Sequence, residues 1–175
     1  MKKIILLLMA CLMGIALFGC GESENTDTGK DVVFRYNGQD ICIDEVYVYA
    51  QTLKEKYESK YGKDVWSQNI VTDDGLEMDA EDAARRETIS KIVKTKTLIT
   101  RSDEYGISLT DSELRKQDQD AEKFYELLTD EQIAEAQLDE DTVKRVLEES
   151  ALADKIYAYV MKQSSTEISD EQARM

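Results

Sequence analysis

The chain has 175 residues, enough for one ordinary domain or for one domain with an appendage. It contains 22 Lys and Arg against 37 Asp and Glu, and the resulting net charge of −15 argues against a nucleic-acid partner, which would require basic patches. Histidine and proline are both absent, which excludes histidine-activated nucleophiles, histidine-bound zinc and proline-rich recognition segments.

Residues 1–19 have the pattern of a secretory signal peptide. A short basic start precedes an apolar run at residues 4–18, which is too short for a comfortable membrane span. The run ends in the sequence LFGC at residues 17–20, which resembles the bacterial lipobox. The resemblance implies cleavage after Gly19 and thioether lipidation of Cys20. The alternative is an ordinary signal peptide followed by an accidental cysteine.

The segment that follows Cys20 predicts a tether. Residues 20–31 are small, polar and aperiodic, so we expect a lipidated cysteine with a flexible connection to a folded body at residues 32–175. Cys42 lies between two isoleucines in a strand-like run, and we expect it to be a small buried side chain.

The folded body is predicted to begin with a β-hairpin. Residues 32–36 and 39–43 flank Asn37-Gly38, a pair that is typical of a type I′ turn because both residues tolerate positive φ. Asp44 is predicted to cap the helix that follows.

The remaining sequence predicts a mostly α protein with about five helices. Helix starts are marked by capping residues, including the two capping boxes Thr110–Glu113 and Thr129–Gln132, and helix ends by Gly62 and Gly106. A turn is expected at residues 73–75. The predicted helices span about residues 45–61, 80–105, 111–127, 130–136 and 140–163.

One more helix start occurs at residues 168–172, shortly before the sequence ends at Met175. We therefore expect either that a longer protein continues past this point or that the tail frays.

The sequence predicts no catalytic residue, no cofactor and no metal site. A glycine-rich phosphate loop and the patterns G-x-S-x-G, S-x-x-K and C-x-x-C are absent. The acidic stretch at residues 73–82 does not fit the calcium-loop template, and it is better explained as a solvated helix entrance.

Aromatic residues are the candidates for a binding site. Tyr47, Tyr49, Tyr57 and Tyr61 fall within the first predicted helix, and the single tryptophan, Trp66, follows it. One interpretation is core packing with the hydroxyls reaching water. The other is an aromatic wall that binds peptides, since such side chains offer a large contact area at low entropic cost.

Several short motifs in a fixed order resemble the N-terminal region of extracytoplasmic foldases of the SurA and PrsA type. They follow the lipobox, and the resemblance covers about residues 32–175. The motifs are YNGQ at residues 36–39, IDE at 43–45, YGKDVWS at 61–67, EYGISLTD at 104–111 and ISDE at 168–171.

The resemblance implies a helical chaperone that is anchored outside the bacterial cell membrane through lipid on Cys20. It would capture unfolded secreted polypeptides in a groove between helices, without ATP or metal. The best groove candidates are the five aromatic residues named above, and the acidic body predicts that basic, apolar clients bind best.

Two further hypotheses stay open. A parvulin-type prolyl isomerase module often follows this region in the family and characteristically uses histidines, so this chain would be the non-catalytic part of a longer isomerase. Alternatively, the chain is a docking module for one specific partner.

Overall fold

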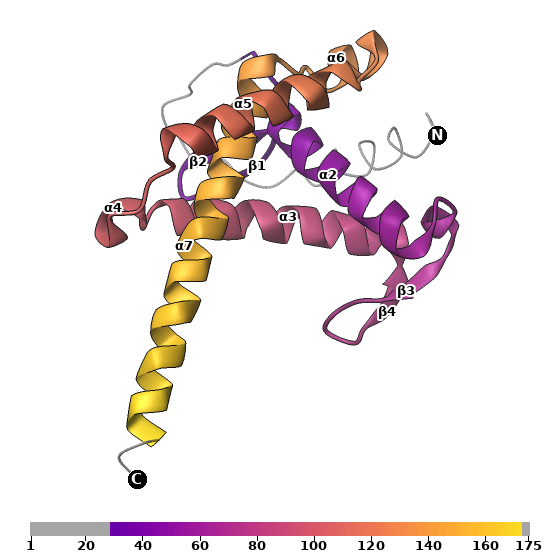
Figure 1. The fold of residues 1–175 in the computed structure, drawn as a ribbon. Coiled ribbons are helices and arrows are strands. Elements are labelled where there is room, and N and C mark those ends of the chain that lie inside the picture. The colour runs from indigo at the N-terminus through magenta and orange to yellow at the C-terminus, as the bar shows by residue number, and fades with distance from the viewer. Residues whose placement is uncertain (1–28, 173–175) are drawn as a thin grey trace. The chain divides into compact units, whose positions relative to one another are not determined.

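The structure is a computed structural model that describes residues 29–172, with side chains up to residue 164 (Figure 1). The predicted signal peptide, the lipidation of Cys20 and most of the tether lie outside the described residues. The elements are β1 (Val32–Tyr36), β2 (Gln39–Cys42), α2 (Ile43–Tyr61), η2 (Val65–Ser67), β3 (Asn69–Val71), β4 (Glu77–Asp79), α3 (Ala80–Ile99), α4 (Ser102–Tyr105), α5 (Asp111–Glu126), α6 (Asp130–Glu135) and α7 (Glu140–Gln172).

The predicted mostly α fold with an N-terminal β-hairpin is confirmed. Within residues 29–172 the structure has six α-helices, where the sequence predicted about five. None of these helices combines the length and the hydrophobicity that crossing a bilayer requires.

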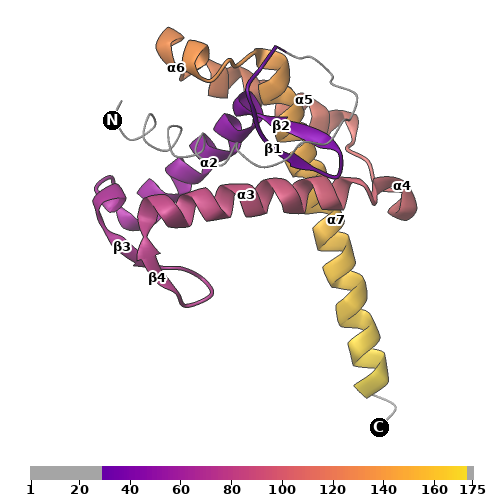
Figure 2. The same ribbon diagram turned by 180° about the vertical axis from the view of Figure 1, so that it is seen from behind.

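The chain divides into two compact units. Among the described residues, the first unit, which we call the hairpin unit, comprises residues 29–92 and 129–139; the second, the helical unit, comprises residues 93–128 and 140–172. The division falls within α3, so that helix contributes residues to both units. In the helical unit, α5 and α7 lie side by side (Figures 1 and 2).

The predicted first hairpin is present in the hairpin unit. β1 and β2 pair antiparallel, with Tyr36 opposite Gln39. The two turn residues, Asn37 and Gly38, have φ values of 49° and 78°, as a type I′ turn requires.

The predicted role of Asp44 as a helix cap is wrong. The capping position of α2 is Cys42, whose side chain makes no capping hydrogen bond. Asp44 instead lies inside the first turn and is buried, and its carboxylate accepts a hydrogen bond from the Lys30 ammonium at 2.5 Å. A contact between residues 14 positions apart has therefore replaced the local cap.

The predicted long helix at residues 80–105 is divided into α3 and α4. The Thr100 hydroxyl donates to the Thr97 carbonyl, and the Arg101 amide donates to the Leu98 carbonyl. Both bonds reach back three residues, which tightens the last turn and ends α3. α4 then ends at Gly106, which adopts the left-handed conformation as predicted.

A second hairpin, β3–β4, was not predicted, although the turn within it was. Ile70 pairs with Met78, and Gly75 in the connecting turn has φ of 80°. Each strand has three residues, which is too short for a recognisable alternation of polar and apolar side chains.

Both predicted capping boxes are present. Thr110 and Glu113 form one at the start of α5, and Thr129 and Gln132 form the other at the start of α6. α7 continues to Gln172, so the separate helix start predicted at residues 168–172 lies inside it.

Candidate peptide-binding site

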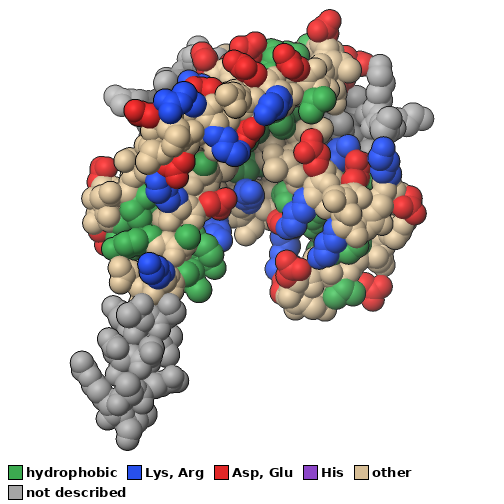
Figure 3. All heavy atoms as spheres, viewed as in Figure 1, with side chains coloured by type: hydrophobic (Ala, Val, Ile, Leu, Met, Phe, Trp, Pro, Cys, Tyr) green, Lys and Arg blue, Asp and Glu red, His purple; other side chains and the backbone are tan. Residues whose placement is uncertain are grey.

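The hairpin unit contains a pocket with a volume of about 310 Å³. Its lining comes from the C-terminal half of α2, the N-terminal half of α3 and the β3–β4 hairpin, which meet at one end of the unit (Figures 1 and 2). Figure 3 shows basic and acidic side chains close together on the visible face of this region. The pocket therefore combines a charged rim with the apolar core beneath it.

One wall of the pocket is an aromatic stack. The Tyr57 ring lies 5.8 Å from the Trp66 ring at an interplanar angle of 11°, and 5.9 Å from the Tyr61 ring at 64°. Tyr57 and Trp66 are almost fully buried, and the Trp66 indole nitrogen donates to Glu58 at 3.0 Å. Because the buried rings are fixed by packing and hydrogen bonding, Tyr61 stands against a rigid support.

The wall also carries a charged hydrogen-bond acceptor. Glu87 on α3 accepts hydrogen bonds from the Tyr57 hydroxyl at 3.0 Å and from the Lys56 ammonium at 2.6 Å. Burial, followed by the contact with Glu87, raises the pKa of Tyr57 well above its usual range. The Tyr57 hydroxyl is therefore a permanent donor, and Glu87 is held in place from two sides.

Asp74, in the turn between β3 and β4, is held in a similar way. It accepts hydrogen bonds from the Thr72 hydroxyl at 2.5 Å and from Arg86 at 2.8 Å. These two contacts, with Thr72 the stronger influence, hold the pKa of Asp74 below its usual value, so the carboxyl group stays charged.

Lys60 is less firmly paired. Its ammonium lies 4.8 Å from the centre of the Tyr61 ring and 3.7 Å from Asp73, an acidic side chain that is 93% exposed. The Tyr61 hydroxyl, with a further contribution from Asp73, raises the pKa of Lys60. Lys60 is therefore a charged group at the rim of the pocket, next to an aromatic ring.

The structure brings together some of the aromatic residues predicted as a peptide wall. Tyr57 and Tyr61 line the pocket, and Trp66 stacks behind Tyr57. Tyr47 and Tyr49 lie near the start of α2 and are 3% and 2% exposed, so they belong to the core there. Burial raises the pKa of Tyr47 to about 12. Whether the five aromatic residues bind peptides stays a prediction.

The sequence alone did not predict the charged residues of the rim. Lys56 and Lys60 are four residues apart and so share one face of a helix, which the sequence does indicate. Their relation to Arg86 and Glu87 depends on the packing of α2 against α3, which no local pattern shows. Within the part of the chain that the structure describes, no group of side chains is arranged to hold a metal ion.

This chain is similar in amino-acid sequence to known proteins. Residues 1–127, which include the whole pocket, match the SurA-like N-terminal domain. The foldase protein PrsA of Caldanaerobacter subterraneus subsp. tengcongensis is 29% identical over 136 residues, a match that spans 77% of this chain and 42% of that protein. No solved structure matches significantly. The chain belongs to the family of SurA-like N-terminal domains.

Proposed function

We propose that this chain is the client-binding region of an extracytoplasmic foldase, which holds unfolded secreted polypeptides and releases them again. The observation that carries the proposal is the match of residues 1–127 to the SurA-like N-terminal domain. The similarity to a foldase and the pocket with its aromatic wall support it. No step of the proposed function requires a catalytic residue or a cofactor.

The pocket suits weak capture of an extended chain. A volume of about 310 Å³ is at the lower end of small-molecule sites, so it accommodates one or two side chains rather than a folded surface. The aromatic wall supplies contact area, and the hydrated ion pairs on the rim limit the net gain from burial. Binding of this kind is reversible and tolerates many sequences, as a chaperone requires.

We also propose that the chain is anchored outside the cell membrane through lipid on Cys20, with residues 20–31 as a tether and residues 32–175 as the chaperone body. The support is the LFGC sequence at residues 17–20 after an apolar run. Replacing Cys20 with Ala should move the exported protein from the membrane fraction to the soluble fraction. A Cys20→Ala variant that stays as membrane-bound as the parent would exclude lipid anchoring.

The proposed function is tested by aggregation of an unrelated protein diluted from denaturant. The full chain, kept in a mild detergent, should suppress the light scattering of the diluted protein without nucleotide. Tyr61→Ala should raise the chain concentration needed for half suppression, because it removes the partly exposed ring of the wall. Tyr159→Ala is the matched control, since Tyr159 is a partly exposed tyrosine of the helical unit. If the parent chain suppresses no aggregation, the single-partner docking hypothesis replaces this one.

The prolyl isomerase hypothesis needs a separate measurement. In a refolding reaction limited by proline isomerisation, catalytic amounts of this chain should leave the half-time at its uncatalysed value of about tens of seconds. Acceleration at catalytic amounts would place isomerase activity within these 175 residues.

A further inference from the structure

We infer that the pocket of the hairpin unit prefers client segments in which an acidic residue lies next to an aromatic side chain, with the carboxylate paired to Lys60. This inference rests on the proposed function and adds to it the chemical class of the recognised segment. It also departs from the expectation, drawn from the net charge of −15, that basic clients bind best.

The pocket is lined by several charged side chains. The lining contains three cations, Lys56, Lys60 and Arg86, and three acidic residues, Asp73, Asp74 and Glu87, so its formal charges balance although the chain as a whole is strongly acidic. All three cationic side chains are about half exposed, at 52%, 52% and 57%, so a ligand can reach them. Repulsion by distant acids is screened beyond about 8 Å at physiological salt, so charges within the pocket decide what binds there.

Lys60 is the cation of the pocket that can exchange its acidic partner most easily. Glu87 is held by both Lys56 and Tyr57, and Asp74 by both Arg86 and Thr72. Asp73, in contrast, is 93% exposed and lies 3.7 Å from Lys60. An exposed pair at that distance contributes little free energy, so a ligand carboxylate can displace Asp73 at small cost.

Lys60 lies next to an aromatic ring, in a pocket that also has apolar lining. The Lys60 ammonium lies against the Tyr61 ring, and Ile70 and Ala83 supply apolar lining in the same pocket. An aromatic side chain from a client can pack edge-to-face against Tyr61, which is the arrangement that Tyr61 already adopts with Tyr57. A carboxylate on the neighbouring client residue then lies within reach of Lys60.

The test uses short peptides with a Gly-Ser background and a central Asp-Phe, Asn-Phe or Asp-Ala pair. Their affinities for the full chain are measured by calorimetry in a mild detergent. Asp-Phe should bind tightest, and Asn-Phe about fivefold more weakly, as the loss of one partly exposed ion pair predicts. Asp-Ala should be weaker still, because it lacks the ring.

The decisive variant is Lys60→Gln, which should abolish the difference between the Asp-Phe and Asn-Phe peptides. Lys116→Gln is the matched control: Lys116 lies on α5, its side chain is 68% exposed, and removing its charge should leave the difference intact. Circular dichroism of both variants confirms that they fold like the parent. If the difference persists in Lys60→Gln, or if Asp-Phe and Asn-Phe bind the parent equally, the inference is wrong.

The outcome also separates this inference from the proposed function. A parent chain that suppresses aggregation but binds none of the peptides keeps the proposed function and overturns the inference. A chain that binds Asp-Phe through Lys60 but suppresses no aggregation keeps the inference and overturns the proposed function.

Discussion

Both compact units of this chain combine buried apolar side chains with ion pairs, but the aromatic cluster lies in the hairpin unit. In the hairpin unit the largest contacts are apolar and aromatic: Tyr57 and Trp66 are buried in one cluster with Leu53, Val65 and Ile70. In the helical unit, ion pairs join helices that are distant in sequence, each at 2.7 Å. They are Lys96 with Glu149, Lys144 with Asp118, and Lys155 with Glu113.

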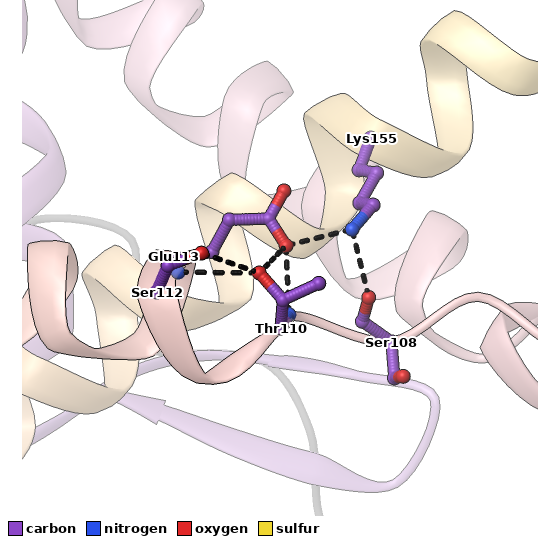
Figure 4. A network of polar contacts seen from close by, with 5 residues as sticks. All are labelled: Ser108, Thr110, Ser112, Glu113 and Lys155. Carbon is purple, nitrogen blue, oxygen red and sulfur yellow. Dashed lines mark hydrogen bonds and ion pairs between the residues drawn. The ribbon is translucent and has the colours of Figure 1, made fainter.

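The clearest case in the helical unit is the start of α5 (Figure 4). One carboxylate oxygen of Glu113 accepts hydrogen bonds from the Thr110 amide at 2.7 Å and from the Thr110 hydroxyl at 2.8 Å. The same oxygen accepts from Lys155 of α7 at 2.7 Å, and Lys155 also donates to the Ser108 carbonyl at 3.0 Å. A local capping box is thus extended into a connection between two helices.

This difference has a general consequence for stability. Burial of apolar surface does not depend on protonation, whereas ion pairs weaken when pH or salt removes or screens their charges. The hairpin unit should therefore respond mainly to the loss of large side chains. The helical unit should respond to single charges and to pH.

The largest expected effect is that of Trp66→Ala in the hairpin unit. Trp66 is 6% exposed and stacks on Tyr57, so truncation leaves a cavity and removes the hydrogen bond from the indole to Glu58. We expect a loss of about 3–5 kcal/mol in the free energy of unfolding, measured by urea titration. Relative to the parent, Trp66→Ala should increase the rate of amide hydrogen exchange more in α2 than in α5.

The control for that experiment is Tyr159→Ala, which truncates a partly exposed aromatic side chain of the helical unit. It should cost much less than Trp66→Ala. If Trp66→Ala costs less than about 1 kcal/mol, the hairpin unit does not depend on its aromatic cluster.

The next effect is that of Lys96→Met in the helical unit. The Lys96 side chain is 7% exposed and Glu149 is 20% exposed, so their pair is largely shielded from water. Removing Lys96 leaves Glu149 with the longer contact to Arg145 at 3.4 Å, and we expect a loss of about 2 kcal/mol.

The double variant Lys96→Met with Glu149→Leu tests the cause. It should recover part of the lost stability, because it removes the carboxylate that Lys96→Met alone leaves without its main partner. A double variant that is less stable than Lys96→Met would show that Glu149 stabilises the unit without Lys96.

Local features and long-range features differ in how far the sequence predicted them. Features that depend on neighbouring residues were found correctly: the turn at Asn37-Gly38, both capping boxes and the glycine after α4. Such features depend on backbone preference and short hydrogen bonds, which a sequence of a few residues determines.

Features that depend on distant residues were missed. Asp44 was predicted as a cap because its local context allows it, but Lys30 binds it. The β3–β4 hairpin is too short to show a pattern, and the cations around the pocket meet only when α2 packs against α3. For the site, the sequence indicated the aromatic residues but not which of them line a pocket.

A pH titration sharpens the comparison further. The hydrogen bond from Lys155, followed by those from Thr110, lowers the pKa of Glu113 from 4.5 to about 2. A carboxyl group whose pKa is lowered by folding stabilises the folded state above its unfolded pKa, and this contribution disappears as pH falls through the folded pKa. The contribution of Glu113 should therefore be complete above about pH 5 and lost between pH 4.5 and 2.

Glu113→Gln tests this prediction, because glutamine can keep the capping box while removing the charge. Parent and variant should differ in melting temperature at pH 6 and converge as the pH approaches 2. A difference that stays constant across this range would mean that the charge of Glu113 does not stabilise the helical unit.

The smallest expected effect compares one capping threonine from each unit. Thr110→Ala should cost about 1 kcal/mol, and Thr129→Ala about 0.5 kcal/mol or less, both measured by urea titration. Thr110 begins a helix of 16 residues and binds a carboxylate that is also bound by α7, whereas Thr129 begins a helix of six residues. The segment that follows α6 has a further attachment, because the Gln137 side chain accepts a hydrogen bond from the Asp31 amide at 2.9 Å.

The comparison is repeated in a Lys155→Ala background, where the cost of Thr110→Ala should fall toward that of Thr129→Ala. Equal costs in the parent background would mean that both capping boxes act only on their own helices, and that the link from α5 to α7 adds nothing to the cap.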